Sequence, residues 1–251
     1  MNNELSASFE RLTEIEAKHP TLIEGLPGHG LVASIAVEQI VTQLGLDHYG
    51  NIVSDAFPQV ASFEDGRIRD LVRVCAGSDP TVMTLQSDVV LSPPASRALS
   101  QCVLEDLAPE FDRAVFLAGA PAETEAQIGD VHGIATTDDL ERELVEAGIE
   151  LAEGRGVING VTGRLATACY HADIPAVVLA VKADPYLPDP TAAQSVIETA
   201  LEPLVHFNID TTELKEQADM IQTRLEDVAQ QFRRAIQQQH SGQQEDPAMY
   251  Q

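Results

Sequence analysis

The chain is short of positive charge. Of its 251 residues, 15 are lysine or arginine and 40 are aspartate or glutamate, which gives a formal net charge of −25. The lysines are Lys18, Lys182 and Lys215. A surface this acidic repels phosphate backbones and anionic lipid headgroups, so nucleic-acid binding and membrane-surface binding are excluded as main roles.

Aromatic residues are also scarce, at 4% with no tryptophan. At low salt, the mutual repulsion of so many carboxylates strains the compact state. Concentrated salt relieves this strain, because the Debye length falls to about 3 Å at 1 M. Few lysines, few aromatics and excess carboxylates together indicate a protein from the cytoplasm of an extreme halophile.

Cysteines and long apolar runs are few as well. Cys75, Cys102 and Cys169 are odd in number and lack C-x-x-C spacing, which favours reduced thiols over disulfides or zinc. The first ten residues are polar, without the apolar core of a signal peptide, and no run approaches the roughly 20 apolar residues of a membrane span. We expect a cytoplasmic protein.

What is present is an alternation of strand and helix patterns, with hydrophobic residues at 44%. Continuous apolar runs such as 176–181 are typical of strands buried on both faces. Strands are predicted at 21–24, 49–54, 68–75, 81–85, 113–119, 131–135 and 176–181. Helices are predicted at 31–44, 93–107, 138–147, 160–171 and 190–204, with Asp138 as an N-cap. The pattern predicts an α/β fold of three layers around a mixed, largely parallel sheet.

This α/β domain is expected over residues 21–207, after a polar lead-in over 1–20 that has at most a short helix. A second pattern covers 211–239, where apolar residues recur at alternating steps of four and three, as in a heptad seam. The seam consists of Leu214, Ala218, Ile221, Leu225, Val228, Phe232 and Ala235. Such a helix either packs along its own chain or forms an oligomer contact. Residues 240–251 are expected to be a flexible tail, because 240–247 contain no apolar residue.

The segment Gly28-His29-Gly30-Leu31-Val32-Ala33 fits the pattern G-x-G-x-x-G/A between a strand and a helix. A helix start of this kind can hold an anion on its free N–H groups. A dinucleotide site would also need an acidic residue after the second strand, and Asp55 comes later than usual. We favour a tight turn, in which the glycines let strand and helix approach closely.

Nucleophile and metal signatures are weak. Ser87-Asp88 follows a strand, and a triad would require His29 to approach this pair in space. The ordinary alternative is a turn or helix cap. The run from Cys169 through His171 to Asp173 lacks a second ligand cluster. The sequence therefore predicts no catalytic residue, no metal site and no cofactor, and the absence of a Walker loop argues against ATP-driven action.

Three prolines stiffen the loop Asp184-Pro185-Tyr186-Leu187-Pro188-Asp189-Pro190. A stiff loop presents Tyr186 and Leu187 at little entropic cost, which suits a contact surface. A rigid connector with no partner is an equally good interpretation.

Three segments in series resemble the proteasome assembly chaperone family, second type, in its archaeal and bacterial branch. They are Gly25 to Ala33, Gly160-Val161-Thr162-Gly163-Arg164-Leu165, and Pro185 to Ala193. The resemblance covers about residues 20–207. It implies a phosphorylase-like three-layer fold, a homo-oligomer and no catalytic residues.

The chain ends in Met249-Tyr250-Gln251. This is similar to the hydrophobic–tyrosine–any-residue (HbYX) signature with which proteasome activators and some assembly chaperones dock. Together with the resemblance, it implies an ATP-independent assembly chaperone or gate-opening activator that binds the α ring of the core proteasome. The need for a paralogous chaperone subunit stays open.

Two alternatives remain at this stage. One is an enzyme of phosphorylase-like or hydrolase-like fold acting on a small nucleoside-like or phosphorylated substrate. The other is an oligomeric scaffold that acts through the heptad seam.

Overall fold

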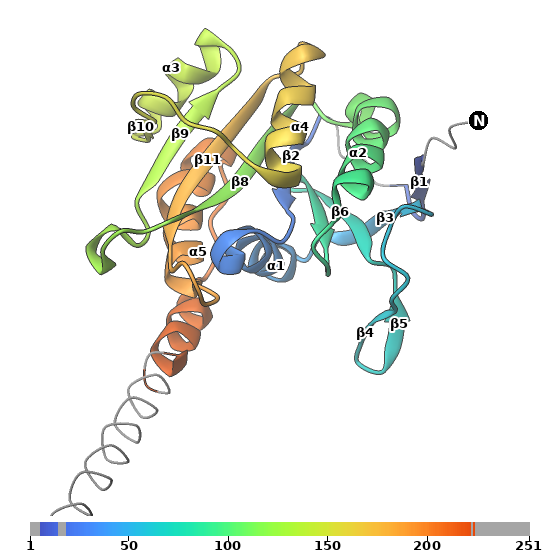
Figure 1. The fold of residues 1–251 in the computed structure, drawn as a ribbon, viewed down its shortest axis with the longest axis horizontal. Helices are drawn as coiled ribbons and strands as arrows, with labels where there is room; N and C mark the ends of the chain where they lie inside the picture. Colours follow the sequence, from blue (N-terminus) through green and yellow to red (C-terminus); the bar gives the residue numbers. More distant parts are fainter. Residues whose placement is uncertain (1–5, 15–18, 222, 224–251) are drawn as a thin grey trace, which may run out of the picture.

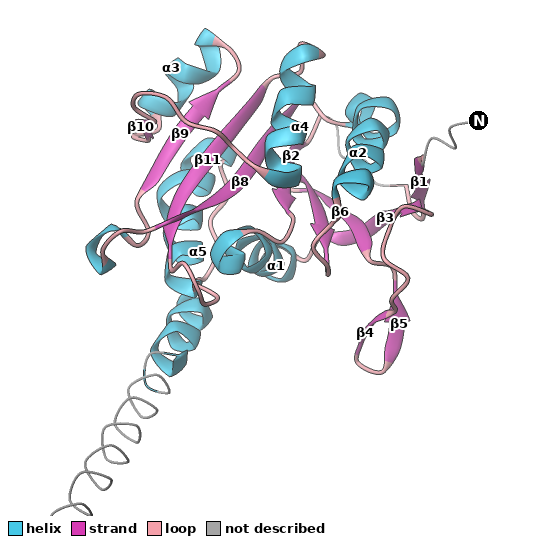
Figure 2. Cartoon of the chain, in the orientation of Figure 1, coloured by secondary structure: helices cyan, strands magenta, loops and turns pink. Residues whose placement is uncertain are grey.

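The computed structural model describes residues 6–14, 19–221 and 223, and within them one mixed sheet runs through the molecule (Figures 1 and 2). Its strand order is β1-β3-β6-β7-β2-β8-β11-β9-β10. The strands are β1 Ala7–Arg11, β2 Thr21–Gly25, β3 Asp47–Ser54, β6 Val72–Ser78, β7 Thr81–Ser87, β8 Arg113–Pro121, β9 Val131–Ala135, β10 Glu150–Leu151 and β11 Ala176–Ala183. The centre of the sheet, from β7 through β2 and β8 to β11, is parallel. Antiparallel strands flank it on both sides, which confirms the predicted mixed sheet.

Helices cover both faces of this sheet. They are α1 Val32–Leu44, α2 Pro93–Cys102, α3 Asp138–Glu146, α4 Gly160–His171, α5 Pro190–Val196 and α6 Glu202–Val205. The predicted helices over 93–107 and 190–204 each continue through a wider π turn, at Val103–Leu107 and Ile197–Leu201. α1, α3 and α5 bury their apolar sides in one core, and α2 and α4 in the other.

Strand β8 shows how one sequence serves two cores. Val115 and Leu117 point into the core under α1 and α5, whereas Ala114 and Phe116 point into the core under α2 and α4. Successive side chains of a strand alternate between the faces of the sheet, so a strand buried on both faces must be apolar throughout. This explains the continuous apolar runs in the sequence and confirms the three-layer architecture.

Side chains cap the first turns of three helices. Ser92 accepts a hydrogen bond from the N–H of Ala95 at the start of α2, and Asp189 does the same for Ala192 at the start of α5. The N-cap of α3 is Thr137, one residue before the predicted Asp138, because a threonine hydroxyl also accepts from the N–H three residues on.

The first twenty residues contribute more than a lead-in. β1 pairs antiparallel with β3 at the sheet edge, and the Phe9 ring lies 5.6 Å from the Tyr49 ring. The short helix expected in this lead-in is therefore wrong, because residues 7–11 form a strand. The strand predicted over 68–75 is also divided: β5 (Arg67–Arg69) pairs with β4 (Ser62–Glu64) in a separate hairpin, and β6 begins only at Val72.

The heptad seam is only partly within the described residues. Residues 212–221 are helical, and Leu214 is buried in the core formed by α1 and α5. Ile221 is half-buried, while Leu225, Val228 and Phe232 lie outside the described residues. The helix thus starts by packing on its own chain. In the part of the chain that the structure covers, no helix combines the length and the apolar character of a membrane crossing.

Candidate functional site

The turn that follows β2 lies directly on β8. Gly30 has φ 62° and Leu31 has φ 49°, so two successive residues turn through the left-handed region before α1 begins at Val32. Gly119 of β8 leaves the space that the turn occupies, because a Cβ there would lie 2.1 Å from the carbonyl oxygen of His29. The positive φ explains Gly30, the close approach explains Gly119, and both support the tight-turn interpretation.

Replacing Gly119 by alanine is expected to push this turn off the sheet. Overpacking of this kind costs about 1–3 kcal/mol of unfolding free energy. Denaturant unfolding in molar KCl measures the loss. Gly156→Ala is the matched control, because a Cβ at Gly156 meets nothing within 4 Å. Equal stability of the two variants would contradict the packing argument.

The proline-rich loop is hydrogen-bonded to the same turn. The N–H of Asp189 donates to the carbonyl oxygen of Gly30 at 2.8 Å. The carboxylate of Asp189 accepts from the N–H of Asp184 at 2.7 Å, and the carboxylate of Asp184 accepts from the N–H groups of Tyr186 and Leu187. These bonds order the loop while the Tyr186 side chain stays 90% exposed.

A buried carboxyl group joins the segment 160–165 to the start of the glycine turn. Glu24, at the end of β2, is fully buried and accepts from the backbone N–H of Leu26 at 3.1 Å and of Leu117 at 3.2 Å. The hydroxyl of Thr162, in the first turn of α4, donates to the same carboxyl at 3.3 Å. Burial raises the pKa of Glu24 to about 8, although these hydrogen bonds act in the opposite direction.

The three segments that carry the family resemblance thus meet at the carboxyl ends of the central strands. The sequence-based predictions gave Glu24 no role. A single glutamate inside the apolar strand Thr21–Gly25 was the available signal. Its partners Leu117 and Thr162 are far away in the sequence, so local patterns could not identify them.

A polar cleft of about 450 Å³ lies beside this centre, at the ends of β2 and β7. Asp88 in this cleft accepts hydrogen bonds from Arg73 at 2.7 and 2.8 Å, from Arg69 and from Ser62. Burial alone raises the pKa of Asp88, but the bonds from Arg73 and Ser62 and the charges of both arginines outweigh it and lower the pKa to about 2. Asp88 therefore stays ionised and paired.

The hypothetical triad is not assembled. The Ser87 hydroxyl donates to the carbonyl oxygen of Val89 at 2.9 Å, within its own loop. Among the described residues, the buried Nε2 atom of His29 has no hydrogen-bond partner, and His29 does not line the cleft that contains Ser87 and Asp88. The turn interpretation of Ser87-Asp88 is the one that the structure supports.

The residues of the dinucleotide and metal hypotheses do not lie together in the structure. Asp55 follows β3, which β6 and β7 separate from β2, so it is not at the strand next to the glycine turn. Cys169 is buried in the core, whereas His171 is exposed, and the two side chains do not converge. No group of three or more His, Cys, Asp or Glu side chains able to hold a metal occurs in the described residues.

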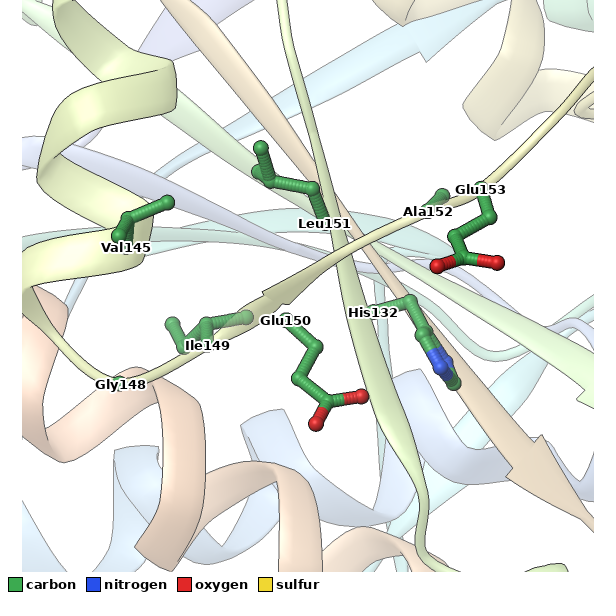
Figure 3. A pocket seen from close by; sticks show the side chains of 8 residues that line it. All are labelled: His132, Val145, Gly148, Ile149, Glu150, Leu151, Ala152 and Glu153. Atoms are coloured by element: carbon green, nitrogen blue, oxygen red, sulfur yellow. The ribbon is translucent and has the colours of Figure 1, made fainter.

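Two further hollows lie away from this centre. One, of about 850 Å³, lies along the edge strand β10, where Figure 3 shows Glu150, Glu153 and His132 apart from the apolar side chains of Val145 and Leu151. The other, of about 700 Å³, lies between α2 and α4. Neither contains Tyr186, Leu187 or the glycine turn. Met249, Tyr250 and Gln251 lie outside the described residues.

Comparison with known proteins agrees with this fold over most of the chain. An uncharacterized protein of Methanocaldococcus jannaschii is 28% identical over 227 residues, which is 90% of this chain and 92% of that protein. The crystal structure of Pyrococcus furiosus PbaA, described as an archaeal homolog of proteasome-assembly chaperone, matches with TM-score 0.82 and 24% identity, over 94% of this chain and 97% of its own. P. furiosus PbaB, described as an archaeal proteasome activator, matches with TM-score 0.81 and 18% identity, over 89% and 99%.

A family model extends across the same region. The PAC2 family model matches residues 22–229, which include the glycine turn, Glu24, the start of α4 and the proline-rich loop. This chain belongs to the PAC2 family.

Proposed function

We propose that this protein is an ATP-independent binding protein that assists assembly of the core proteasome or opens its gate. The observation that carries the proposal is the agreement with PbaA and PbaB, whose folds match about nine-tenths of this chain. One of these relatives is described as an assembly-chaperone homolog and the other as an activator, so both roles belong to the proposal.

The docking element in this proposal is the C-terminal tail. Tyr250 would supply ring area and a hydroxyl to a pocket between ring subunits, and Met249 would fill an adjacent apolar gap. The α-carboxylate of Gln251 would pair with a pocket lysine. The polar spacer over 240–247 suits a segment that folds on binding.

The loop of Tyr186 and Leu187 would be a second contact surface. Tyr186 is almost fully exposed, yet the backbone beneath it is fixed by Asp184 and Asp189. A side chain presented on an ordered loop loses little entropy on binding. This supports the contact interpretation over that of a plain connector.

The experiment is a pull-down of core proteasome in molar KCl with two proteins, the full chain and a chain lacking residues 249–251. The full chain is expected to retain the proteasome and to change its peptidase activity in the same samples. The truncated chain is expected to do neither. Equal retention by both would remove the tail from the docking role.

The alternative enzyme gains no support from the polar cleft. Its two arginines are held by Asp88, and the hydroxyl of Ser87 is engaged within its own loop. A phosphorylated substrate would have to compete with Asp88 for both guanidinium groups. The binding role is therefore the one that the geometry supports best.

A further inference from the structure

The cleft of about 700 Å³ between α2 and α4, called here the α2–α4 cleft, reverses the charge of the rest of the chain. Its lining includes Arg97, Arg164 and His171, and no aspartate or glutamate. The whole chain has 40 acidic and 15 basic residues, so a cleft with two arginines and no carboxylate is unlike its average surface.

The two helices that form the cleft run in the same direction, side by side (Figure 1). α2 follows β7 in the chain, and the first turn of α4 contacts the end of β2, where Thr162 donates to Glu24. β2 and β7 are parallel neighbours, and both helices lead to the starts of the parallel strands β8 and β11. Arg97 is the fifth residue of α2 and Arg164 is the fifth residue of α4, so the two arginines lie at about the same level.

The helix faces that border the cleft also share one spacing. From each arginine onward, the lining residues follow at steps of three, one and three. They are Arg97, Ser100, Gln101 and Leu104 on α2 and its continuation, and Arg164, Thr167, Ala168 and His171 on α4. Residues with this spacing form one stripe along a helix, here about 10 Å long. Two such stripes make an open trough, which suits an elongated ligand.

The two arginines of the cleft have no anionic partner of their own. Within the described residues, neither Arg97 nor Arg164 forms an ion pair. By contrast, Arg69, Arg73 and Arg113 each contact a carboxylate. Two guanidinium groups in one cleft repel each other unless an anion lies between them, and each can hold a carboxylate through two parallel hydrogen bonds.

The other lining groups favour a carboxylate over a phosphate. The hydroxyls of Ser100 and Thr167 each donate to the carbonyl oxygen four residues earlier, both at 2.8 Å. A hydroxyl has one hydrogen to donate, so neither is left for the further oxygens of a phosphate. Leu104 and Ala168 add apolar surface, which suits the methylene groups of a peptide side chain.

We propose that the α2–α4 cleft binds an acidic segment of a partner protein, with one glutamate or aspartate carboxylate held between Arg97 and Arg164. The net charge of −25 repels such a segment from the rest of the surface, so the cleft also directs where it binds. This contact involves neither the C-terminal residues nor the loop of Tyr186, and it does not depend on docking to a proteasome.

The test is the binding of a fluorescent decapeptide of glutamate and alanine to the full chain in molar KCl, followed by fluorescence anisotropy. The matched probe has glutamine in place of every glutamate and is expected to bind far more weakly. The double variant Arg97→Gln/Arg164→Gln is expected to weaken binding of the glutamate peptide by about tenfold or more, because it removes both charge-assisted contacts. Its circular dichroism should be unchanged, since both arginines are exposed.

The control is Arg67→Gln/Arg142→Gln, which removes the same charge from two exposed arginines outside the cleft and should bind as the unaltered chain does. Equal binding of the two peptides, or an equal loss in the control, would overturn the proposal.

Two further measurements identify a different occupant. If inorganic phosphate displaces the glutamate peptide better than succinate does, the cleft is a phosphate site and the proposal is wrong. A fall in oligomer mass in Arg97→Gln/Arg164→Gln would assign the cleft to a contact between copies and would equally end it. The chain lacking residues 249–251 should bind the peptide unchanged, which separates this proposal from tail docking.

Discussion

Tyr250→Ala is expected to abolish retention of the core proteasome without changing the fold. A buried aromatic anchor at an interface contributes about 2–4 kcal/mol, which corresponds to roughly 30- to 1,000-fold in the dissociation constant of one tail. When several tails of one oligomer bind the same ring, each tail raises the affinity through its effective concentration. Because the substitution weakens every tail, the affinity of the oligomer falls by more than that of a single tail. A single substitution in the last three residues should therefore have the largest functional effect in the chain.

The measurement is surface-immobilised binding of core proteasome in molar KCl, with unfolding followed in parallel. Tyr170→Ala is the matched control, because Tyr170 is a 60% exposed tyrosine on α4. Tyr250→Phe should retain most of the binding, since only the hydroxyl is lost. If Tyr250→Ala unfolds or dissociates the protein, the tail has a structural role and the docking assignment is wrong.

Glu24→Ala is expected to cause the largest loss of stability. The substitution removes the acceptor from the buried N–H groups of Leu26 and Leu117. Each such group left without a partner costs about 1–3 kcal/mol, and a cavity adds to the cost. Denaturant unfolding gives the difference, with the exposed Glu146→Ala as the control. Equal stabilities would show that the Glu24 carboxyl does not hold these segments together.

Glu24 should also make stability depend on pH in an unusual direction. Its pKa is about 8 in the folded protein, against the ordinary glutamate value of 4.5, so the folded state holds this proton more tightly than the unfolded state. The resulting stabilisation is complete below pH 4.5 and is lost as pH rises to about 8. From the linkage between proton binding and folding, the free energy of unfolding that Glu24 contributes should fall by roughly 3 kcal/mol between pH 5 and 8.

The variant Glu24→Gln isolates this effect, because glutamine keeps the shape and does not titrate. The difference in unfolding free energy between the unaltered chain and Glu24→Gln should fall across pH 5–8 and level off above it. Other titrating groups contribute to both proteins and cancel. A constant difference across this range would mean that Glu24 is ionised throughout.

Local patterns in the sequence determined much of the architecture. The strands at β2, β8, β9 and β11 and the helices α1 and α4 were predicted within one or two residues, because apolar periodicity, glycine and proline act over a few neighbours. The three-layer α/β class and the family were also predicted, and the PAC2 match over residues 22–229 confirms the latter. The docking tail stays a prediction.

Only the tertiary structure decided which distant residues meet. β1 is a strand because β3, some forty residues later, offers it an edge, and the hairpin β4–β5 was hidden inside a strand pattern. Glu24 reaches Thr162 across 138 positions, and Asp88 gathers Ser62, Arg69 and Arg73. Hydrogen-bond partners and surface exposure depend on which distant segments the fold brings together, and this leaves no periodic pattern in the sequence. Local patterns therefore predicted the glycine and proline turns but not the carboxyl groups that join them.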